Sequence, residues 1–394
     1  MTPGARLSAA MEILDAVLAG EPAERALTRW ARASRFAGSK DRAAVRDLVF
    51  DALRRRRSLA WAGGAETGRA ILLAGQAAEG AALDALCTGA GHDPAPLTPA
   101  ERARLAAPPP APDPVRLDYP DFLDAPLRAA LGEGFEAALQ AMQARAPVDL
   151  RVNALKADPA RALAVLAADG VTAEPHPLAP HALRVTGNPR ALAAGRAYGE
   201  GLVELQDVSS QLVAALCGAG PGMTVLDYCA GGGGKTLALA ARMGGTGRLL
   251  AWDANPRRMA DLPDRARRAG AAVRLLDGAG LARLGAACDL VLADAPCSGT
   301  GAWRRKPEGK WRATPEGIAA FAPLQDAILE AARAHVRPGG ALAYATCSLL
   351  RVENEDRAAA FLRRHPDWTL EVERRLGIAD GGDGFYFARF RAPA

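Results

Sequence analysis

Residues 289–301 form the feature that most constrains the fold, a short apolar run that ends in small and polar residues. Four apolar residues lead to Asp294, and a proline, Cys297 and two glycines follow. Such a run, bounded by turn residues, is typical of a buried strand in a parallel sheet. Residues 340–348 have the same form and contain Cys347 near their end. Because ligands bind at the carboxyl ends of strands in open α/β sheets, the two runs predict two thiols at one functional edge.

From residue 201 to residue 394 the chain alternates strand and helix patterns, which is typical of an α/β fold with a parallel sheet. The expected strands are Thr224–Cys229, Arg248–Asp253, Ala272–Asp277, Asp289–Ala295, Gly340–Cys347, Trp368–Val372 and Phe385–Phe390. The expected helices include Pro256–Ala269, Pro315–Val336 and Glu353–Arg364.

The part before residue 201 is expected to contain two smaller domains. Residues 1–107 are predicted to be helical, because apolar residues recur there at helical spacing. A proline-rich segment over residues 106–114 predicts a domain boundary. Residues 115–200 then predict a helix over 122–143 and a small α/β unit, which consists of a strand over 149–153, a helix over 159–169 and a strand near 183–186.

The charge and the cysteines limit the class of protein. The formal net charge of +5 permits a polyanionic partner but is too small to demonstrate one. None of the six cysteines has Cys-x-x-Cys spacing or a histidine at metal-ligand spacing, so no metal site is expected. The N-terminus does not resemble an export signal, and no apolar run approaches the roughly 20 residues that span a bilayer. We therefore expect a cytoplasmic monomer without a membrane span.

Residues 225–236 predict a strand, a glycine turn and a helix start, and two kinds of ligand could explain the turn. A phosphate-binding loop, as in an NTPase, requires a glycine where Cys229 stands, and a side chain there fills space that the phosphate needs. The alternative is a nucleoside cofactor whose ribose diol binds an acid at the end of the next strand. Asp253 stands there, about 20 residues beyond the turn, so the nucleoside is favoured.

Two further carboxylates support the nucleoside. Asp277 and Asp294, like Asp253, stand at the ends of expected strands. Asp277 is placed to reach an adenine edge. A helix cap could explain any one of these acids, but it explains all three poorly.

Three motifs together resemble the Sun/Nop, or RsmB-like, family of RNA cytosine-5 methyltransferases. They are Cys-Ala-Gly-Gly-Gly-Gly-Lys-Thr at 229–236, Asp-Ala-Pro-Cys-Ser-Gly-Thr-Gly at 294–301 and Tyr-Ala-Thr-Cys-Ser-Leu-Leu-Arg-Val-Glu-Asn-Glu at 344–355. The resemblance covers residues 118–392. The helical N-terminal part resembles, more faintly, the NusB-type RNA-binding domain of the bacterial 16S rRNA member. The chain departs from the family at Gly231 and Gly232, where Ala-Pro is usual.

The resemblance implies a class-I, Rossmann-like methyltransferase domain that transfers a methyl group from S-adenosylmethionine to carbon 5 of cytosine. The implied substrate is rRNA, with tRNA as the alternative. Cys347 would add to carbon 6, and Cys297 would assist product release. Asp294 would hydrogen-bond the cytosine, and Lys235 would orient the loop. The implied cofactor-binding residues are Cys229, Ala230, Gly231, Gly232, Gly233, Gly234, Lys235, Asp253, Arg258, Asp277 and Asp294.

The stretch over residues 303–311, which closely follows Cys297, alternates tryptophans with cations and predicts an RNA contact. Bases that leave the stack of a folded RNA are read by aromatic rings and guanidinium planes. An ordinary exposed loop is the alternative. The small α/β unit is expected to add two basic contacts. The expected RNA-binding residues are Arg151, Lys156, Arg304, Arg305 and Lys306.

Overall fold

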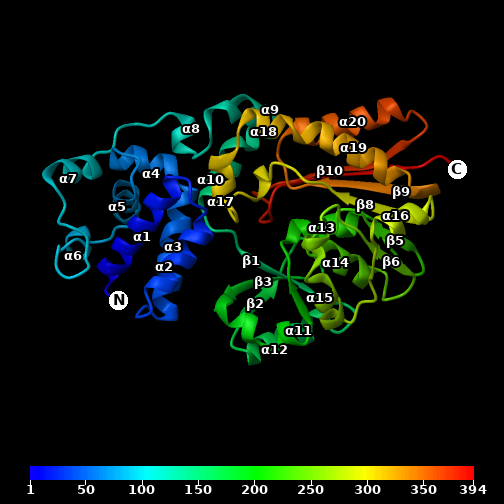
Figure 1. Cartoon of the computed structure of the whole chain (residues 1–394), viewed down its shortest axis with the longest axis horizontal. Helices are drawn as coiled ribbons and strands as arrows, with labels where there is room; N and C mark the ends of the chain where they lie inside the picture. Colours follow the sequence, from blue (N-terminus) through cyan, green and yellow to red (C-terminus); the bar gives the residue numbers. More distant parts are fainter. The chain divides into compact units, whose positions relative to one another are not determined.

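The structure is a computed structural model that describes residues 1–394, and its contacts divide the chain into two compact units. Unit 1 consists of Met1–Arg145 and Trp303–Ala313. Unit 2 consists of Ala146–Ala302 and Thr314–Ala394 (Figure 1). The chain therefore enters unit 1 a second time, directly after the loop that contains Cys297.

Unit 1 is helical, as the sequence predicts for its N-terminal part. Its helices bury an aliphatic core, because apolar residues recur along one face of each longer helix; Leu14, Val45, Val49 and Ile71 are fully buried. The helices are α1 (Pro3–Leu18), α2 (Ala23–Ala33), α3 (Ser39–Arg54), α4 (Arg56–Gly63), α5 (Gly68–Ala78), α6 (Leu83–Leu86), α7 (Pro99–Ala106), α8 (Asp113–Arg116), α9 (Asp124–Leu131), α10 (Phe135–Gln143) and α17 (Pro307–Arg312).

The proline-rich segment does not separate two compact units, which differs from the expected boundary between residues 107 and 115. Trp61 Nε1 donates a hydrogen bond to the carbonyl of Pro109 at 3.1 Å, and the amide of Ser58 donates to Asp118 at 2.9 Å. These contacts join the segment and the residues that follow it to the preceding helices. The single helix expected over residues 122–143 is wrong, because Gly132 has a positive φ of 53° and separates α9 from α10.

Unit 2 begins with a four-stranded antiparallel sheet of order β2-β3-β1-β4. Its strands are β1 (Val148–Val152), β2 (Thr172–Pro175), β3 (Ala182–Gly187) and β4 (Val203–Leu205). Helix α11 (Pro159–Ala168) packs Leu166 against Leu150 and Leu183 of this sheet. The sequence predicted β1, α11 and β3, but it missed the two short strands at the edges.

The second sheet of unit 2 has the strand order β10-β11-β9-β8-β5-β6-β7 and contains all seven strands that the sequence predicts. Strands β5 to β9 run parallel, and β10 and β11 are antiparallel to their neighbours. The α/β fold class is confirmed. The strands are β5 (Thr224–Asp227), β6 (Arg248–Ala251), β7 (Arg274–Leu275), β8 (Cys288–Asp294), β9 (Val336–Thr346), β10 (Thr369–Leu376) and β11 (Phe385–Arg391).

Helices cover both faces of this sheet (Figure 1). On one face α19 and α20 bury Leu329 and Phe361, and on the other α13 and α14 bury Val213 and Leu239. No helix combines the length and apolar character needed to cross a bilayer. The helices of unit 2 beyond α11 are α12 (Arg196–Gly199), α13 (Val208–Leu216), α14 (Gly234–Arg242), α15 (Leu262–Ala269), α16 (Gly278–Leu284), α18 (Pro315–Ala319), α19 (Phe321–Arg333) and α20 (Glu355–Arg364).

Two of the expected helices are divided, and a proline explains each division. Residues 256–269 form a 3₁₀ turn, η4 (Pro256–Met259), followed by α15, with Pro263 in the first turn of that helix. The helix expected over 315–336 forms α18 and α19, with Pro323 in the first turn of α19, and it ends at Arg333 because Val336 already begins β9. The third expected helix begins as a 3₁₀ turn, η6 (Arg351–Glu353), before α20.

Candidate functional site

The two cysteines at the carboxyl ends of neighbouring strands lie in contact. Strands β8 and β9 are paired in parallel, with Asp294 opposite Ala345, so the loops that follow them begin at the same edge. The sulfur of Cys297 lies 3.4 Å from the sulfur of Cys347. Both thiols are reduced and partly exposed. The sequence therefore predicted correctly that the two strands bring their thiols together.

Lys235 and Asp294 form an ion pair beside the thiols. Lys235 lies in the first turn of α14, and its Nζ donates to Asp294 Oδ2 at 2.7 Å. The Nζ also lies 4.8 Å from the centre of the Phe385 ring. Burial alone would lower the pKa of Lys235, but the charge and hydrogen bond of Asp294 outweigh it, so this pKa is raised. Lys235 is therefore a positive charge fixed at the edge of the sheet.

The surroundings distinguish the two thiols. The hydrogen bond from Cys297 lowers the pKa of Cys347, and the charge of Lys235 acts in the same direction. The hydrogen bond to Cys347, together with burial, raises the pKa of Cys297 well above its usual value. A thiolate is the nucleophilic form of cysteine. The arrangement thus favours a thiolate at Cys347 and a neutral thiol at Cys297.

The glycine turn between β5 and α14 has a backbone that depends on its glycines. Gly231 and Gly233 have positive φ values of 50° and 81°, which residues with side chains rarely adopt. A Cβ on Gly233 would also lie 2.1 Å from Leu262 Cδ1. An alanine at position 231 would be strained at this φ, because residues with a side chain rarely adopt it.

Asp253 lies directly beside this turn. Its Oδ2 accepts a hydrogen bond from the Gly231 amide at 3.0 Å, and Arg258 Nη1 lies 3.2 Å from the same oxygen. The carboxylate is thereby fixed two residues beyond β6 and next to the glycine backbone, where the sequence placed a ribose-binding acid.

Other expected cofactor residues lie in the same region but make different contacts. Asp277 follows β7 by two residues, is exposed, and caps α16 through the Gly280 amide at 2.6 Å. Four further expected residues belong to the turn itself, namely Cys229, Ala230, Gly232 and Gly234. Burial raises the pKa of the Cys229 thiol, so this thiol remains protonated.

A fourth carboxylate at this edge, Asp227, is the last residue of β5 and was not among the residues predicted from the sequence. Asp227 is 1% exposed, and Thr236 Oγ1 donates to its Oδ2 at 2.7 Å. Its Oδ1 has no hydrogen-bond partner. Burial raises the pKa of Asp227 to about 7. The sequence contained a signal, since Asp227 follows an apolar run and precedes the glycine turn, and it ends β5 as Asp294 ends β8.

The two basic residues of the small α/β unit that were expected to bind RNA, Arg151 and Lys156, form hydrogen bonds within unit 2. Arg151 is buried, and its Nε donates to Gln206 Oε1 at 2.7 Å. Lys156 Nζ donates to the carbonyls of Glu200 and Arg268 at 3.0 and 2.6 Å. Arg151 cannot contact RNA in this conformation, because its side chain points into the unit.

The basic stretch after Cys297, which was expected to contact RNA or, alternatively, to be an ordinary exposed loop, contains both buried and exposed cations. Arg304 is 4% exposed, and its carbonyl accepts a hydrogen bond from Arg54 Nε at 2.7 Å within unit 1. Lys310 is buried as well and donates to the carbonyl of Arg54 at 2.9 Å. Arg305 is partly exposed and Lys306 is exposed. The sequence could not distinguish these neighbours, because burial depends on the helices that receive them.

Two family models match the chain. One, described as 16S rRNA methyltransferase RsmB/F, matches residues 217–391. The other, described as the ferredoxin-like domain of RsmF/B-like methyltransferases, matches residues 119–191. The chain belongs to the RsmB/F methyltransferase family. The family resemblance inferred from the three motifs is thereby confirmed.

Curated members of the RsmB/F family extend this similarity. Ribosomal RNA small subunit methyltransferase B of Erwinia tasmaniensis is 36% identical over 285 residues, which are 69% of this chain and 66% of that protein. The protein of the same name from Citrobacter koseri is 35% identical over 289 residues, or 70% of this chain and 66% of that one. The chain thus matches just under two thirds of the length of these relatives.

Solved structures support the fold. PH0851 has a TM-score of 0.77 at 23% identity, covering 99% of both chains. A methyltransferase homolog protein from Pyrococcus horikoshii has a TM-score of 0.63 at 26% identity, covering 71% of this chain and 97% of that one.

Proposed function

We propose that this RsmB/F family member is an rRNA (cytosine-5) methyltransferase that uses S-adenosylmethionine. The observation that carries the proposal is the contact of two thiols, 3.4 Å apart, beside the Lys235–Asp294 ion pair at the carboxyl edge of a parallel sheet. Carbon 5 of cytosine is a poor nucleophile until a thiolate adds to carbon 6. rRNA is favoured over tRNA by the names of the curated relatives.

Cys347 supplies the nucleophile in this mechanism. Its sulfur forms a bond to carbon 6, which moves electron density from the 5,6 double bond to carbon 5. After carbon 5 has accepted a methyl group, a base takes the proton from carbon 5. The electrons of that carbon–hydrogen bond reform the 5,6 double bond, and the carbon–sulfur bond breaks with its electrons returning to Cys347. Cys297 is 3.4 Å from Cys347 and assists this release.

Asp294 and Lys235 stabilise the charge that develops in the cytosine and hold the reacting groups in position. Asp294 is partly exposed at the end of β8, so its second oxygen is available to hydrogen-bond the cytosine ring or its amino group. Lys235 fixes the orientation of Asp294 and favours the thiolate of Cys347. A fixed cation and anion at one edge need little reorganisation when charge develops in the base.

The residues present fit the cofactor of this family. Asp253, fixed by the Gly231 amide, would bind the ribose hydroxyls, and the glycine backbone of residues 231–234 permits close approach. Arg258 would adjust as the ribose binds, since it shares an oxygen of Asp253. S-adenosylmethionine, when bound, supplies the electrophilic methyl group. The Gly-Lys-Thr turn also resembles a phosphate loop, and binding of ATP without S-adenosylmethionine would favour an NTPase instead.

The proposal is tested by bisulfite sequencing of total RNA from a deletion strain complemented with wild-type or variant protein. Wild type should restore one or more protected cytosines in rRNA. Cys347→Ala should reduce methylation by about 10³-fold or more, because the nucleophile is lost. Cys297→Ala should accumulate a covalent protein–RNA adduct that survives denaturing electrophoresis. An adduct with Cys347→Ala instead would exchange the two roles, and no rRNA difference in the deletion strain would contradict the proposed substrate.

A further inference from the structure

Glu353, in the 3₁₀ turn η6, is a fully buried carboxylate outside the set of residues described so far. It is 0% exposed, and all of its hydrogen-bond donors are neutral groups. Burial of a carboxylate is costly unless several donors are present. Four donors converge here, so the position of this side chain is strongly determined.

The donors come from the residues that follow the two cysteines. Ser298, next to Cys297, donates its amide to Glu353 Oε1 at 2.8 Å and its hydroxyl to Oε2 at 2.5 Å. Ser348, next to Cys347, donates its hydroxyl to the same Oε2. One carboxylate therefore joins both cysteine loops at the residue directly after each thiol.

A second side chain connects Glu353 to the start of the first loop. Gln325 of α19 is fully buried and donates its Nε2 to Glu353 Oε1 at 3.2 Å and to the carbonyl of Pro296 at 3.0 Å. Pro296 precedes Cys297, so the backbone is attached on both sides of that cysteine.

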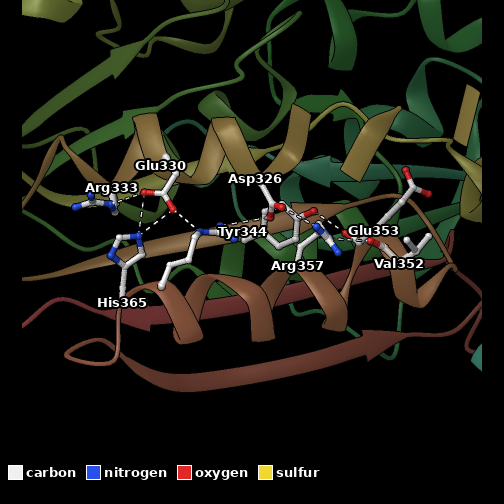
Figure 2. A network of polar contacts seen from close by, with 9 residues as sticks. Asp326, Glu330, Arg333, Tyr344, Val352, Glu353, Arg357 and His365 are labelled. Carbon is white, nitrogen blue, oxygen red and sulfur yellow. Dashed lines mark hydrogen bonds and ion pairs between the residues drawn. The ribbon is translucent and has the colours of Figure 1, made fainter. Parts of the chain in front are cut away.

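The backbone of η6 is held in place by hydrogen bonds from β9 and from α20, and α20 is in turn linked to α19 (Figure 2). The Tyr344 hydroxyl of β9 donates to the Glu353 carbonyl at 2.6 Å. Arg357 of α20 donates to the Val352 carbonyl at 2.9 Å and to Asp326 of α19 at 2.6 Å. The carboxylate is thus anchored to the sheet and to both helices that cover it.

We propose that Glu353 is a positioning residue for methyl transfer: its carboxylate fixes the distance and orientation of the Cys297 and Cys347 sulfurs through Ser298 and Ser348. This inference rests on the proposed function, and it adds a residue that never contacts the substrate. Small displacements of reacting groups are costly, with about 100-fold in rate lost for a misplacement of about 1 Å.

The charge of Glu353 adds to this geometric role. The hydrogen bond to Cys347 and burial raise the pKa of Cys297, and the charge of Glu353 raises it further. The charged groups that act most on the pKa of Cys347 are Asp294 of β8, Lys235 of α14 and Asp383 before β11, and not Glu353. Glu353 therefore increases the difference between the two thiols, whereas a neutral side chain at this position would reduce it.

The test compares Glu353→Gln, Glu353→Ala and the control Glu330→Gln. Glutamine keeps the shape of Glu353 and one acceptor oxygen but removes the charge, whereas alanine removes both. Glu330 links α19 to α20 through His365 at 2.9 Å and contacts neither cysteine loop, so its change reports only the loss of a carboxylate in that layer (Figure 2). Thermal unfolding of each variant establishes that it is folded.

Two readouts are measured. The first is the steady-state rate on rRNA, for which we expect Glu353→Gln to lower kcat about tenfold with KM for RNA unchanged, and Glu330→Gln to change neither. The second needs no RNA and measures, by peptide mass spectrometry, the pH midpoint of iodoacetamide alkylation at Cys297 and Cys347. In Glu353→Gln the Cys297 midpoint should fall toward that of Cys347.

These outcomes separate the two proposals. Wild-type alkylation midpoints in both Glu353 variants, or equal effects in Glu330→Gln, would overturn the positioning role. If wild type has no methyltransferase activity but the midpoints shift as expected, the proposed function fails while the role of Glu353 in fixing the thiols stands. If Glu353→Ala does not fold, the glutamine variant decides.

Discussion

Single buried carboxylates at the edge of the large sheet have measurable consequences for stability, and Asp227 is the clearest case. Its pKa is raised by burial from 3.8 to about 7, so the folded state binds a proton that the unfolded state has already lost. The free energy of unfolding should therefore fall as the pH rises from about 4 to about 7, and this contribution is largest at low pH. Asp227→Asn should remove it.

The measurement is urea unfolding of wild type and Asp227→Asn at pH 5 and pH 8. The difference in unfolding free energy between the two proteins should change by about 2–3 kcal/mol between these pH values, in favour of the variant at pH 8. The variant also keeps an acceptor for the Thr236 hydroxyl. A pH-independent difference would mean that Asp227 has an ordinary pKa.

At the scale of elements, the loop after β8 is packed against the segment before β11 at Gly301. The Gly301 amide donates to the Cys347 carbonyl, and its own carbonyl accepts from the Gly384 amide, both at 2.9 Å. A Cβ on Gly301 would lie 2.1 Å from the Gly384 oxygen. Gly301→Ala should therefore separate the loops and lower the unfolding free energy by about 1–3 kcal/mol.

Gly278→Ala provides the matched control for Gly301→Ala. Gly278 lies at the start of α16, and a Cβ there would have no atom within 4 Å. Its effect on the unfolding free energy should stay within about 0.5 kcal/mol of zero or be slightly stabilising. Equal losses for the two variants in chemical denaturation would show that the contact with Gly384 is unimportant.

The elements also show which parts of the site a single sequence can predict. Strands β8 and β9 were predictable because an apolar run followed by turn residues depends on local composition, and their parallel pairing then placed Cys297 and Cys347 together. The roles of Glu353 and Arg304 were not predictable. Both are charged residues in irregular segments, and only the tertiary arrangement determines that each is buried.

At the scale of the whole molecule, the segment over residues 303–313 contains both buried and exposed cations. Lys306 is exposed and remains a candidate RNA contact, so Lys306→Ala should weaken RNA binding uniformly and reduce the slope of log affinity against log salt by about 1. Arg304 is buried, and Arg304→Ala should instead lower the unfolding free energy of unit 1 by about 1–3 kcal/mol.

Filter binding over a range of salt concentrations, paired with thermal melting, separates these effects. An unchanged salt slope in Lys306→Ala would remove its RNA contact, and a changed slope in Arg304→Ala at wild-type stability would show that its side chain becomes exposed.

Because the chain enters unit 1 twice, parts of this protein cannot be exchanged freely with those of a relative to make a hybrid protein. Unit 1 contains, besides its N-terminal helices, residues 303–313, which lie in the sequence between two stretches of unit 2. A hybrid gene that joins the first 145 residues of one species to the remainder of another would pair mismatched surfaces around Lys310 and Trp311. A functional chimaera therefore requires two exchanged stretches, residues 1–145 and residues 303–313, taken from the same parent protein.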